Sequence, residues 1–173
     1  YVKKMNFDIV ILFARKFLDY YYNQFGIFGI SHYTSLTLKS SDIFKFSNIK
    51  YNTRKAKISD LKLIKKSYDF TYLKCKNVFL RNYKYWNFIY NKIIIEKKNT
   101  IQVLEENNKF LGYVIKNKNH IYEIGVSPMI NKYKLLKSLC YNKKDIEIDI
   151  IQNHPILNYI DNIDYIFKFR QCC

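Results

Sequence analysis

The chain has 173 residues, 49% of them hydrophobic, and carries a formal net charge of +16. This length suits one ordinary domain rather than two full-sized ones, and the apolar content excludes wholesale disorder. No apolar run reaches the ~20 residues that a spanning helix needs, so we expect neither a membrane anchor nor a membrane partner.

The positive charge would fit a protein that binds nucleic acid, because phosphate contacts need clustered Lys and Arg. Lysine, however, greatly outnumbers arginine and is spread along the chain rather than massed. This pattern favours a solvated surface, and we do not expect nucleic acid as a partner.

The four cysteines stand at positions 75, 140, 172 and 173. They form no Cys-x-x-Cys pair, and the histidines do not add the spacing of a zinc site. We therefore expect no metal, and free thiols favour a reducing, cytoplasmic compartment.

The first elements in chain order lie in residues 1–38. Residues 8–13 are a continuous apolar, β-branched run that predicts a buried strand, and residues 15–25 have the aromatic spacing of a helix. Residues 31–38 are rich in β-forming residues and predict another strand. The polar stretch 39–50 is expected to be an irregular, exposed linker.

A second series begins with a strand at 51–56 and a helix at about 59–70. We expect Ser59 to cap this helix, with Ile58 packed against its first turn. The apolar side chains that should face the core recur at helical spacing: Leu61, Ile64 and Tyr68.

The clearest pattern follows a second predicted helix at 82–95. Strand-like runs at 101–105, 109–115 and 120–126 are joined by two short polar turns. Three strands with tight connections predict an antiparallel meander, so a helix through 101–115 would contradict the assignment.

The remaining elements close the domain. We expect a helix at 131–140, a strand at 146–151, a short helix that opens at His154-Pro155, and a last strand at 165–169. The whole order is strand, helix, helix, three-strand meander, helix, strand, helix, strand, which predicts an α/β (α+β) fold.

This order resembles that of the GNAT superfamily of N-acetyltransferases, and local sequences agree with it. The run from Arg81 to Trp86 is similar to the Arg-x-x-x-Tyr-Trp segment of predicted acetyltransferases of the enhanced-intracellular-survival type. Residues 53–61 resemble their domain opening, residues 105–114 resemble their Gly-Tyr hairpin, and residues 150–157 resemble their late strand and helix. The resemblance implies a GNAT-like mixed, mostly antiparallel sheet with helices on both faces.

The opening segment resembles a different part of the same fold. Residues 8–13, followed by Tyr21-Tyr22-Asn23-Gln24-Phe25-Gly26, are similar to the fifth strand and the aromatic helix end of an acetyltransferase. The resemblance implies a tandem arrangement: 1–38 as the C-terminal remnant of a first acetyltransferase domain, 39–50 as a linker, and 51–173 as a second domain. We expect 8–38 to pair with or lean on the second domain. A central strand supplied by 8–38 to the sheet of 101–127 would contradict the tandem arrangement.

By this resemblance, the enzyme would move an acetyl group from acetyl-CoA to a primary amine of a small molecule or protein. Backbone N–H groups at a helix start would hold the pyrophosphate, and a tyrosine would protonate the departing thiolate. Tyr22 matches the position of that tyrosine. The alternative is that Tyr22 packs in a core beside Phe17 and Phe25.

The second domain departs from the family at the pyrophosphate segment. Residues 126–136 contain no glycine where the family has Arg/Gln-x-x-Gly-x-Gly/Ala, so the backbone cannot easily approach a phosphate. We expect a degenerate second domain with a structural or substrate-shaping role. Acetyl-CoA would be bound mainly by residues that precede Tyr1, and the isolated residues 50–173 should not bind it.

Three carboxylates are candidate bases for the amine: Glu105, Glu106 and Glu123. Burial statistics favour the first two as surface groups of the hairpin. Glu123, in the centre of its strand, is therefore the candidate that we keep.

Two other functions stay open. A non-catalytic GNAT-like binding or packing module is favoured by the missing glycines, and a basic nucleic-acid-associated protein is favoured by the charge alone. An oligomer is compatible with the sequence.

Overall fold

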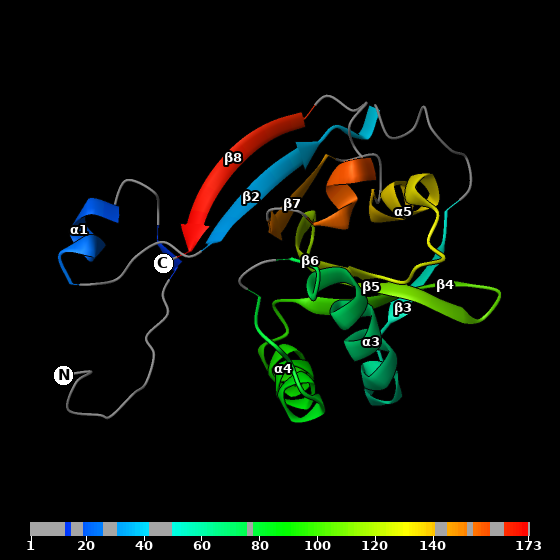
Figure 1. Ribbon diagram of the computed structural model, residues 1–173. Coiled ribbons are helices and arrows are strands. Elements are labelled where there is room, and N and C mark those ends of the chain that lie inside the picture. The colour runs from blue at the N-terminus through cyan, green and yellow to red at the C-terminus, as the bar shows by residue number, and fades with distance from the viewer. Residues whose placement is uncertain are drawn as a thin grey trace.

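Strands from most of the chain form one mixed sheet, and helices pack on both of its faces (Figure 1). The computed structural model describes residues 13–14, 19–25, 31–41, 50–75, 78–140, 145–151, 154–159 and 165–172. The strands are β1 (Phe13–Ala14), β2 (Ser31–Leu38), β3 (Asn52–Lys55), β4 (Thr100–Glu106), β5 (Lys109–Asn117), β6 (His120–Val126), β7 (Ile146–Ile151) and β8 (Tyr165–Cys172). The helices are α1 (Asp19–Asn23), α3 (Leu61–Tyr72), α4 (Tyr83–Glu96) and α5 (Lys132–Leu139), with short 3-10 helices η3 (Ile58–Asp60) and η4 (Pro155–Tyr159).

The strand order across the sheet is β1-β8-β2-β7-β6-β5-β4-β3. Neighbouring strands are antiparallel except β6 and β7, which run parallel. The expected fold class, an α/β (α+β) arrangement with a mostly antiparallel sheet and helices on both faces, is confirmed.

The predicted meander is present as β4, β5 and β6. Val103 of β4 lies opposite Tyr113 of β5, which in turn lies opposite Gly125 of β6. The β4–β5 turn holds Asn107 and Asn108 at φ angles of 51° and 61°, a left-handed conformation that asparagine adopts more readily than most residues. Two such residues close the hairpin tightly, which explains why this register was predictable.

Each face of the sheet has its own apolar core. α3 and α4 cover one face, and α5 and η4 cover the other (Figure 1). On the first face, the side chains expected to point inward are 0–2% exposed, and Trp86 of α4 is 0% exposed. These buried side chains are Leu61, Ile64 and Tyr68. The helical spacing therefore predicted the buried face of α3 correctly.

The start of the first long helix differs from the expected one. The Asp60 carboxylate, not Ser59, accepts a backbone N–H, that of Lys57, at 2.7 Å. Asp60 is also held by Arg54 at 2.6 Å. Ile58 is 55% exposed, so it does not pack against the first turn. Both details of the predicted cap were wrong, because the salt bridge to β3 turns Asp60 toward the helix start.

β2 is an interior strand of the same sheet as the meander. It lies between β7 and β8, with Leu36 opposite Ile148 of β7 and Phe167 of β8. Leu36 and Leu38 are 0% exposed in the core under α5. Residues 31–38, expected to belong to the remnant of a first domain, are therefore an interior strand of the sheet that contains the meander. This placement counts against a division of the chain at 39–50, and a first acetyltransferase domain ahead of this chain stays a prediction.

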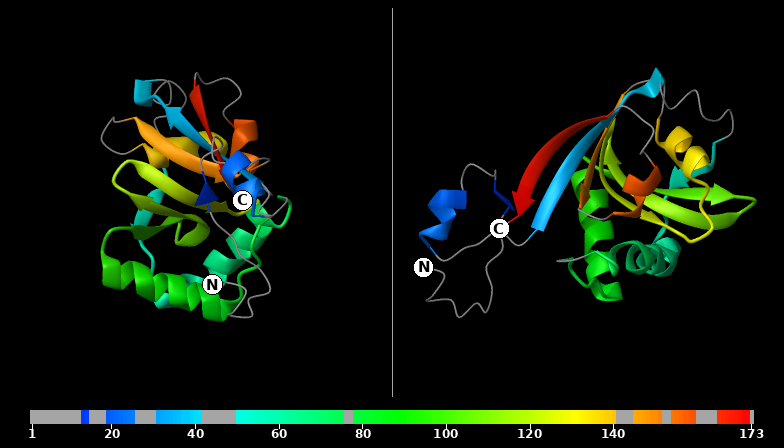
Figure 2. Two further views of the ribbon diagram at one scale, coloured as in Figure 1. Left: turned by 90° about the vertical axis from the view of Figure 1, so that its left-hand side faces the viewer. Right: turned by 45° about the horizontal axis from the view of Figure 1, so that its top comes forward.

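Other expectations near the N-terminus are tested only in part. Of the predicted strand at 8–13 only Phe13 is described, as part of β1. Of the predicted helix at 15–25 the structure describes 19–25, where α1 covers Asp19–Asn23. Most of the predicted linker, 42–49, is outside them too. α1 lies beyond the ends of β2 and β8, apart from the body formed by α3, α4 and α5 (Figures 1 and 2). None of the described helices is long and apolar enough to cross a membrane.

Candidate functional site

The sheet opens between β6 and β7. These parallel strands pair only at His120–Glu147 and Ile121–Ile148. From there β6 continues to Val126 and β7 to Ile151, with no further pairing between them among the described residues. Ligands of open α/β sheets bind in crevices at the carboxyl ends of parallel strands, so this crevice is the first candidate site.

Three side chains fill the crevice by bonding the free edge of β6. The Tyr72 hydroxyl accepts the N–H of Ile124 at 3.4 Å, and the Thr71 hydroxyl accepts the N–H of Val126 at 2.9 Å. The carbonyl oxygen of Ile124 lies 3.0 Å from Nε2 of His154. An extended ligand with amide groups would need these backbone groups as its partners. The protein has therefore satisfied the edge with its own side chains.

His154 occupies the crevice as a neutral imidazole. Its Nδ1 accepts the N–H of Ile156 at 3.1 Å, so Nε2 carries the proton that is donated to Ile124. The residue is 1% exposed, and burial lowers the pKa of His154 to about 4 because an imidazolium would lose its hydration there. Its ring meets Tyr72 edge-on, with 5.1 Å between centroids. His154 and Tyr72 thus pack against each other as well as bonding β6.

Glu123, the candidate base in the centre of β6, forms a largely buried ion pair with Arg81. Arg81 donates from Nη2 to Oε2 at 2.8 Å and from Nη1 to Oε1 at 2.9 Å, and the Tyr113 hydroxyl donates to Oε1 at 2.6 Å. The Arg81 guanidinium also lies over the Tyr68 ring, 4.4 Å from its centroid. Both carboxylate oxygens are engaged, so the geometry gives Glu123 a structural role rather than that of a free base.

Burial and the paired carboxylate set the charge states in this cluster. Burial raises the pKa of Tyr113 well above its usual value, and Glu123 raises it further. Burial lowers the pKa of Arg81, but Glu123 outweighs it and the net shift is upward. Tyr113 also leaves no room beside Gly125, where a Cβ atom would stand 2.1 Å from its Cε1. The cluster is one closely packed unit that ties α4 to the sheet.

The two hairpin carboxylates are paired as well. Glu105 accepts from Arg54 at 2.6 Å and Glu106 accepts from Lys134 at 2.5 Å. The same Arg54 bonds Asp60, and this hydrogen bond is the main reason that the pKa of Asp60 is lowered. Glu105 and Glu106 therefore join β4 to β3 and to α5, and neither is brought near the β6–β7 crevice as a free base.

Backbone N–H groups of the glycine-free segment at the start of α5 donate hydrogen bonds within the protein. The side-chain oxygen of Asn131 caps the helix by accepting the N–H groups of Tyr133 and Lys134 at 3.0 and 3.1 Å. The N–H of Asn131 donates to the Tyr51 hydroxyl at 2.7 Å, and that of Ser127 donates to a β5 carbonyl at 2.8 Å. A helix start holds an anion through unpaired N–H groups. Here these groups are already bonded.

Tyr22, the predicted proton donor, lies in α1 and is not brought to the crevice. Its ring meets that of Tyr21 edge-on, with 5.3 Å between centroids. Phe25, an expected core neighbour, is 64% exposed, and Phe17 lies outside the described residues. α1 stands apart from α3, α4 and α5 in two orientations (Figures 1 and 2). The role of Tyr22 therefore stays a prediction that concerns a different site.

The part of the chain that the structure describes contains neither a metal-binding cluster nor a reactive thiol. No group of three His, Cys, Asp or Glu side chains there could hold a metal ion. Cys75 and Cys140 are buried and form no disulfide, and burial raises the pKa of both thiols, that of Cys140 to about 12. A thiol that stays protonated is a poor nucleophile, so neither is a candidate reactive group.

Sequence reasoning missed the residues that fill the crevice. The predicted helix stopped at 70, two residues before the end of α3, and so left out Thr71 and Tyr72. A usable signal was present, because both residues follow Tyr68 at helical spacing and continue its buried face. His154 had no comparable local marker. Arg81, by contrast, was singled out by the Arg-x-x-x-Tyr-Trp pattern, although not as the partner of Glu123.

Comparison with known proteins identifies the fold. No model of a protein family and no curated protein sequence matches the chain. A GCN5-related N-acetyltransferase from Kribbella flavida matches with a TM-score of 0.63 at 10% identity, over 98% of this chain and 44% of that chain. A probable N-acyltransferase from Enterococcus faecalis V583 matches with a TM-score of 0.66 at 12% identity, over 99% and 46%. An acetyltransferase of the GNAT family from Colwellia psychrerythraea matches with a TM-score of 0.57 at 11% identity, over 94% and 63%.

At these identities the likeness establishes the fold, which is that of the GNAT N-acetyltransferases. The chain spans less than half the length of the Kribbella and Enterococcus proteins. Activity, cosubstrate and acceptor therefore rest on the site.

Proposed function

We propose that this chain is part of an N-acetyltransferase that moves an acetyl group from acetyl-CoA to a primary amine, and that its GNAT-fold domain has a structural or substrate-shaping role. The observation that carries the proposal is the filled crevice. Thr71, Tyr72 and His154 bond the β6 edge, and Asn131 bonds the N–H groups at the start of α5. A cosubstrate would need both sets of backbone groups.

The catalytic step would belong to residues that precede this chain, together with Tyr22. The amine nitrogen attacks the thioester carbonyl carbon, the C–S bond breaks, and the departing thiolate takes a proton. A tyrosine hydroxyl held near that sulfur supplies this proton, and the proton that the acylated nitrogen loses returns through water to the tyrosinate. The fold likeness to acetyltransferases that are longer than this chain supports such an arrangement. A small-molecule or protein amine as acceptor, and a cytoplasmic location, are part of the same proposal.

Calorimetry with acetyl-CoA tests the structural role. The fragment used should be residues 1–173 rather than 50–173, because the shorter piece lacks β2, the strand between β7 and β8. We expect no heat of binding at micromolar concentrations for 1–173, and binding for a longer protein that includes the residues ahead of Tyr1. Micromolar binding by 1–173 alone would overturn the assignment.

Kinetics of the longer protein test the role of Tyr22. Tyr22→Phe should lower kcat and leave acetyl-CoA affinity nearly unchanged, because only the proton donor is lost. Tyr21→Phe is the matched control, since Tyr21 is its neighbour in α1 and is 54% exposed. Equal turnover of wild type and Tyr22→Phe would return Tyr22 to a packing role.

A non-catalytic GNAT-fold binding or packing module is the second candidate, and the filled crevice favours it as well. The residues ahead of Tyr1 separate the two candidates. An Arg-x-x-Gly-x-Gly/Ala segment there would supply a pyrophosphate loop for the enzyme. Its absence, with no acetyltransferase activity of the longer protein, would favour the module.

A further inference from the structure

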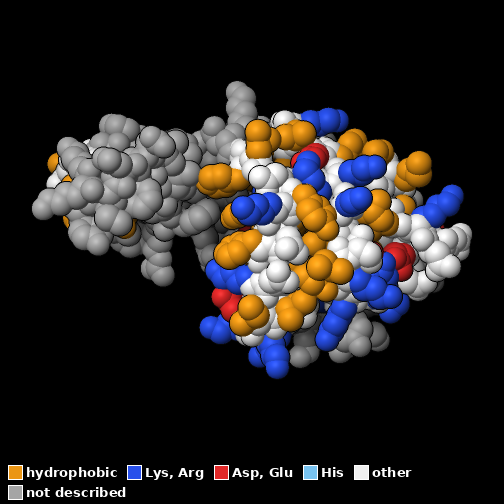
Figure 3. Space-filling view, turned by 90° about the horizontal axis from the view of Figure 1, so that it is seen from below, with side chains coloured by type: hydrophobic (Ala, Val, Ile, Leu, Met, Phe, Trp, Pro, Cys, Tyr) orange, Lys and Arg blue, Asp and Glu red, His pale blue; other side chains and the backbone are white. Residues whose placement is uncertain are grey.

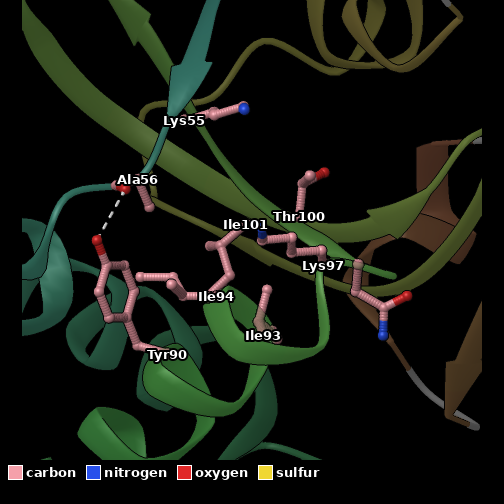
Figure 4. A pocket seen from close by; sticks show the side chains of 9 residues that line it. Lys55, Ala56, Tyr90, Ile93, Ile94, Lys97, Thr100 and Ile101 are labelled. Atoms are coloured by element: carbon pink, nitrogen blue, oxygen red, sulfur yellow. Dashed lines mark hydrogen bonds between the residues drawn. The ribbon is translucent and has the colours of Figure 1, made fainter.

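A hollow lies between α4 and the β3–β4 edge of the sheet (Figure 4). Its volume is about 370 Å³, within the range of roughly 300–1,000 Å³ of small-molecule pockets. The walls are mostly apolar. They include Ala56 after β3, Tyr90, Ile93 and Ile94 of α4, and Ile101 of β4.

Two hydrogen bonds hold the walls of the pocket together. The Ala56 N–H donates to the Ile101 carbonyl at 2.9 Å, and the Tyr90 hydroxyl donates to the Ala56 carbonyl at 3.4 Å. These bonds join the end of β3 to β4 and to α4 around the hollow. The pocket is therefore preformed, as ligand sites usually are.

One lysine reaches over this apolar pocket. Lys97 stands at the end of α4 with φ of 54°. Lys55 borders the pocket from β3, but its side chain points away from the apolar walls (Figure 4). Figure 4 shows the Lys97 side chain reaching across the pocket toward Ile101. Neither lysine forms an ion pair with another described residue, whereas Glu96, the acidic residue next to Lys97, is paired with Lys92. An apolar hollow bordered by an ammonium group that pairs with no described carboxylate is complementary to a small anion with an apolar body.

The surroundings carry the same two kinds of side chain. The view of the α3–α4 face shows hydrophobic and Lys or Arg side chains interleaved, with few acidic ones (Figure 3). α4 is apolar on its outward side too: Phe88, Ile94 and Ile95 are 58%, 53% and 77% exposed. These exposed side chains alternate with polar ones such as Lys92 and Glu96. A ligand tail that leaves the pocket would meet these exposed apolar side chains along α4.

We propose that this pocket binds an aliphatic monocarboxylate, with the carboxylate at Lys97 and the tail against Ile93, Ile94 and Ile101. A bare phosphate would leave the apolar walls unused, and a neutral hydrocarbon would leave the Lys97 ammonium group unused. The site is distinct from the β6–β7 crevice and does not depend on acetyl transfer.

Octanoate is the probe, titrated into the isotope-labelled 173-residue chain and followed by the amide NMR signals. We expect saturable shifts of the Ile93, Ile94 and Ile101 amides at about millimolar concentration, as the efficiency of small ligands predicts. Octanamide, which has the same tail without the charge, should bind about threefold or more weakly. No saturable shift at these amides, or equal affinity for octanamide, would overturn the proposal.

Matched substitutions at neighbouring positions in and just after α4 test where octanoate binds. Ile94→Glu should weaken octanoate binding about tenfold, because it removes apolar contact and adds a like charge, and Ile95→Glu should leave it unchanged. Lys97→Gln should weaken binding about threefold, and Lys98→Gln should not. Ile94 and Lys97 line the pocket, whereas Ile95 and Lys98 do not. Equal losses within either pair would contradict the site.

Discussion

The β6–β7 crevice and the α4 pocket lie in the same molecule and differ in what occupies them. In the crevice, Tyr72 and His154 are 6% and 1% exposed and the backbone edge is bonded. At the pocket, Ile94 is 53% exposed, and Lys55 and Lys97 have no ion-pair partner among the described residues. The place where a fold opens its sheet is thus not always the place left free for a ligand. Substitutions in the crevice should cost stability, whereas those at the pocket should cost binding.

The largest expected loss of stability comes from Glu123→Ala, in the cluster of Arg81, Tyr113 and Glu123 beside the crevice. It would leave Arg81 buried without its carboxylate and Tyr113 without its acceptor. Breaking a buried ion pair by removing one partner costs about 3–5 kcal/mol. Urea unfolding should therefore show a much lower midpoint. Glu106→Ala is the control. The Glu106 side chain is 44% exposed, so its ion pair with Lys134 should contribute about 0–1 kcal/mol. Similar losses in both variants would contradict the structural role of Glu123.

The next effect is a pH dependence that His154 imposes on the crevice. Its pKa is lowered from the model-peptide value of 6.5 to about 4 in the folded protein, so the unfolded chain binds a proton that the folded one does not. Stability is fully present above pH ~6.5 and is lost as the pH falls toward ~4, by up to about 3 kcal/mol. Unfolding free energies measured across this window test it. His154→Gln should flatten the curve between these pH values, and an unchanged slope would contradict the argument.

A smaller loss is expected from Thr71→Val, which keeps the shape of the side chain and removes its hydroxyl. The N–H of Val126 would lose its 2.9 Å partner inside the crevice. A buried group left without a partner costs about 1–3 kcal/mol. Hydrogen exchange should show a faster Val126 amide, together with a lower unfolding midpoint. Thr53→Val on the exposed side of β3 is the matched control and should change little. An unaltered Val126 amide would contradict the proposed edge contact.

How much of this was predictable depends on the range of the interactions. The meander follows from alternation and from Asn107 and Asn108, which act over a few residues. The buried face of α3 follows from its helical spacing in the same way. Residues 31–38 were predicted as a strand, but their neighbours in the sheet are more than a hundred positions away. Alternation indicates a strand and does not name its partner, so the insertion of β2 was missed.

The crevice was hidden for a related reason. Thr71, Tyr72 and His154 meet only after α3, β6 and η4 have packed, and each alone looks like an ordinary polar residue at the end of an element. The glycine-free 126–136 segment was the local signal that predicts a missing anion site. The Asn131 cap and the Tyr51 hydroxyl supply its physical explanation.

The smallest stability change is expected at the pocket, from Ile94→Glu. Ile94 is 53% exposed on α4, and Glu is at least as good a helix former as Ile, so stability should change by less than about 0.5 kcal/mol. Ile101→Ala is the contrasting variant, because this side chain is 4% exposed between α4 and the sheet and its loss should cost about 2–4 kcal/mol. Thermal unfolding of both variants measures the difference. If Ile94→Glu destabilised the chain as much as Ile101→Ala, Ile94 would belong to the core, and the surface that distinguishes the pocket from the crevice would not be free.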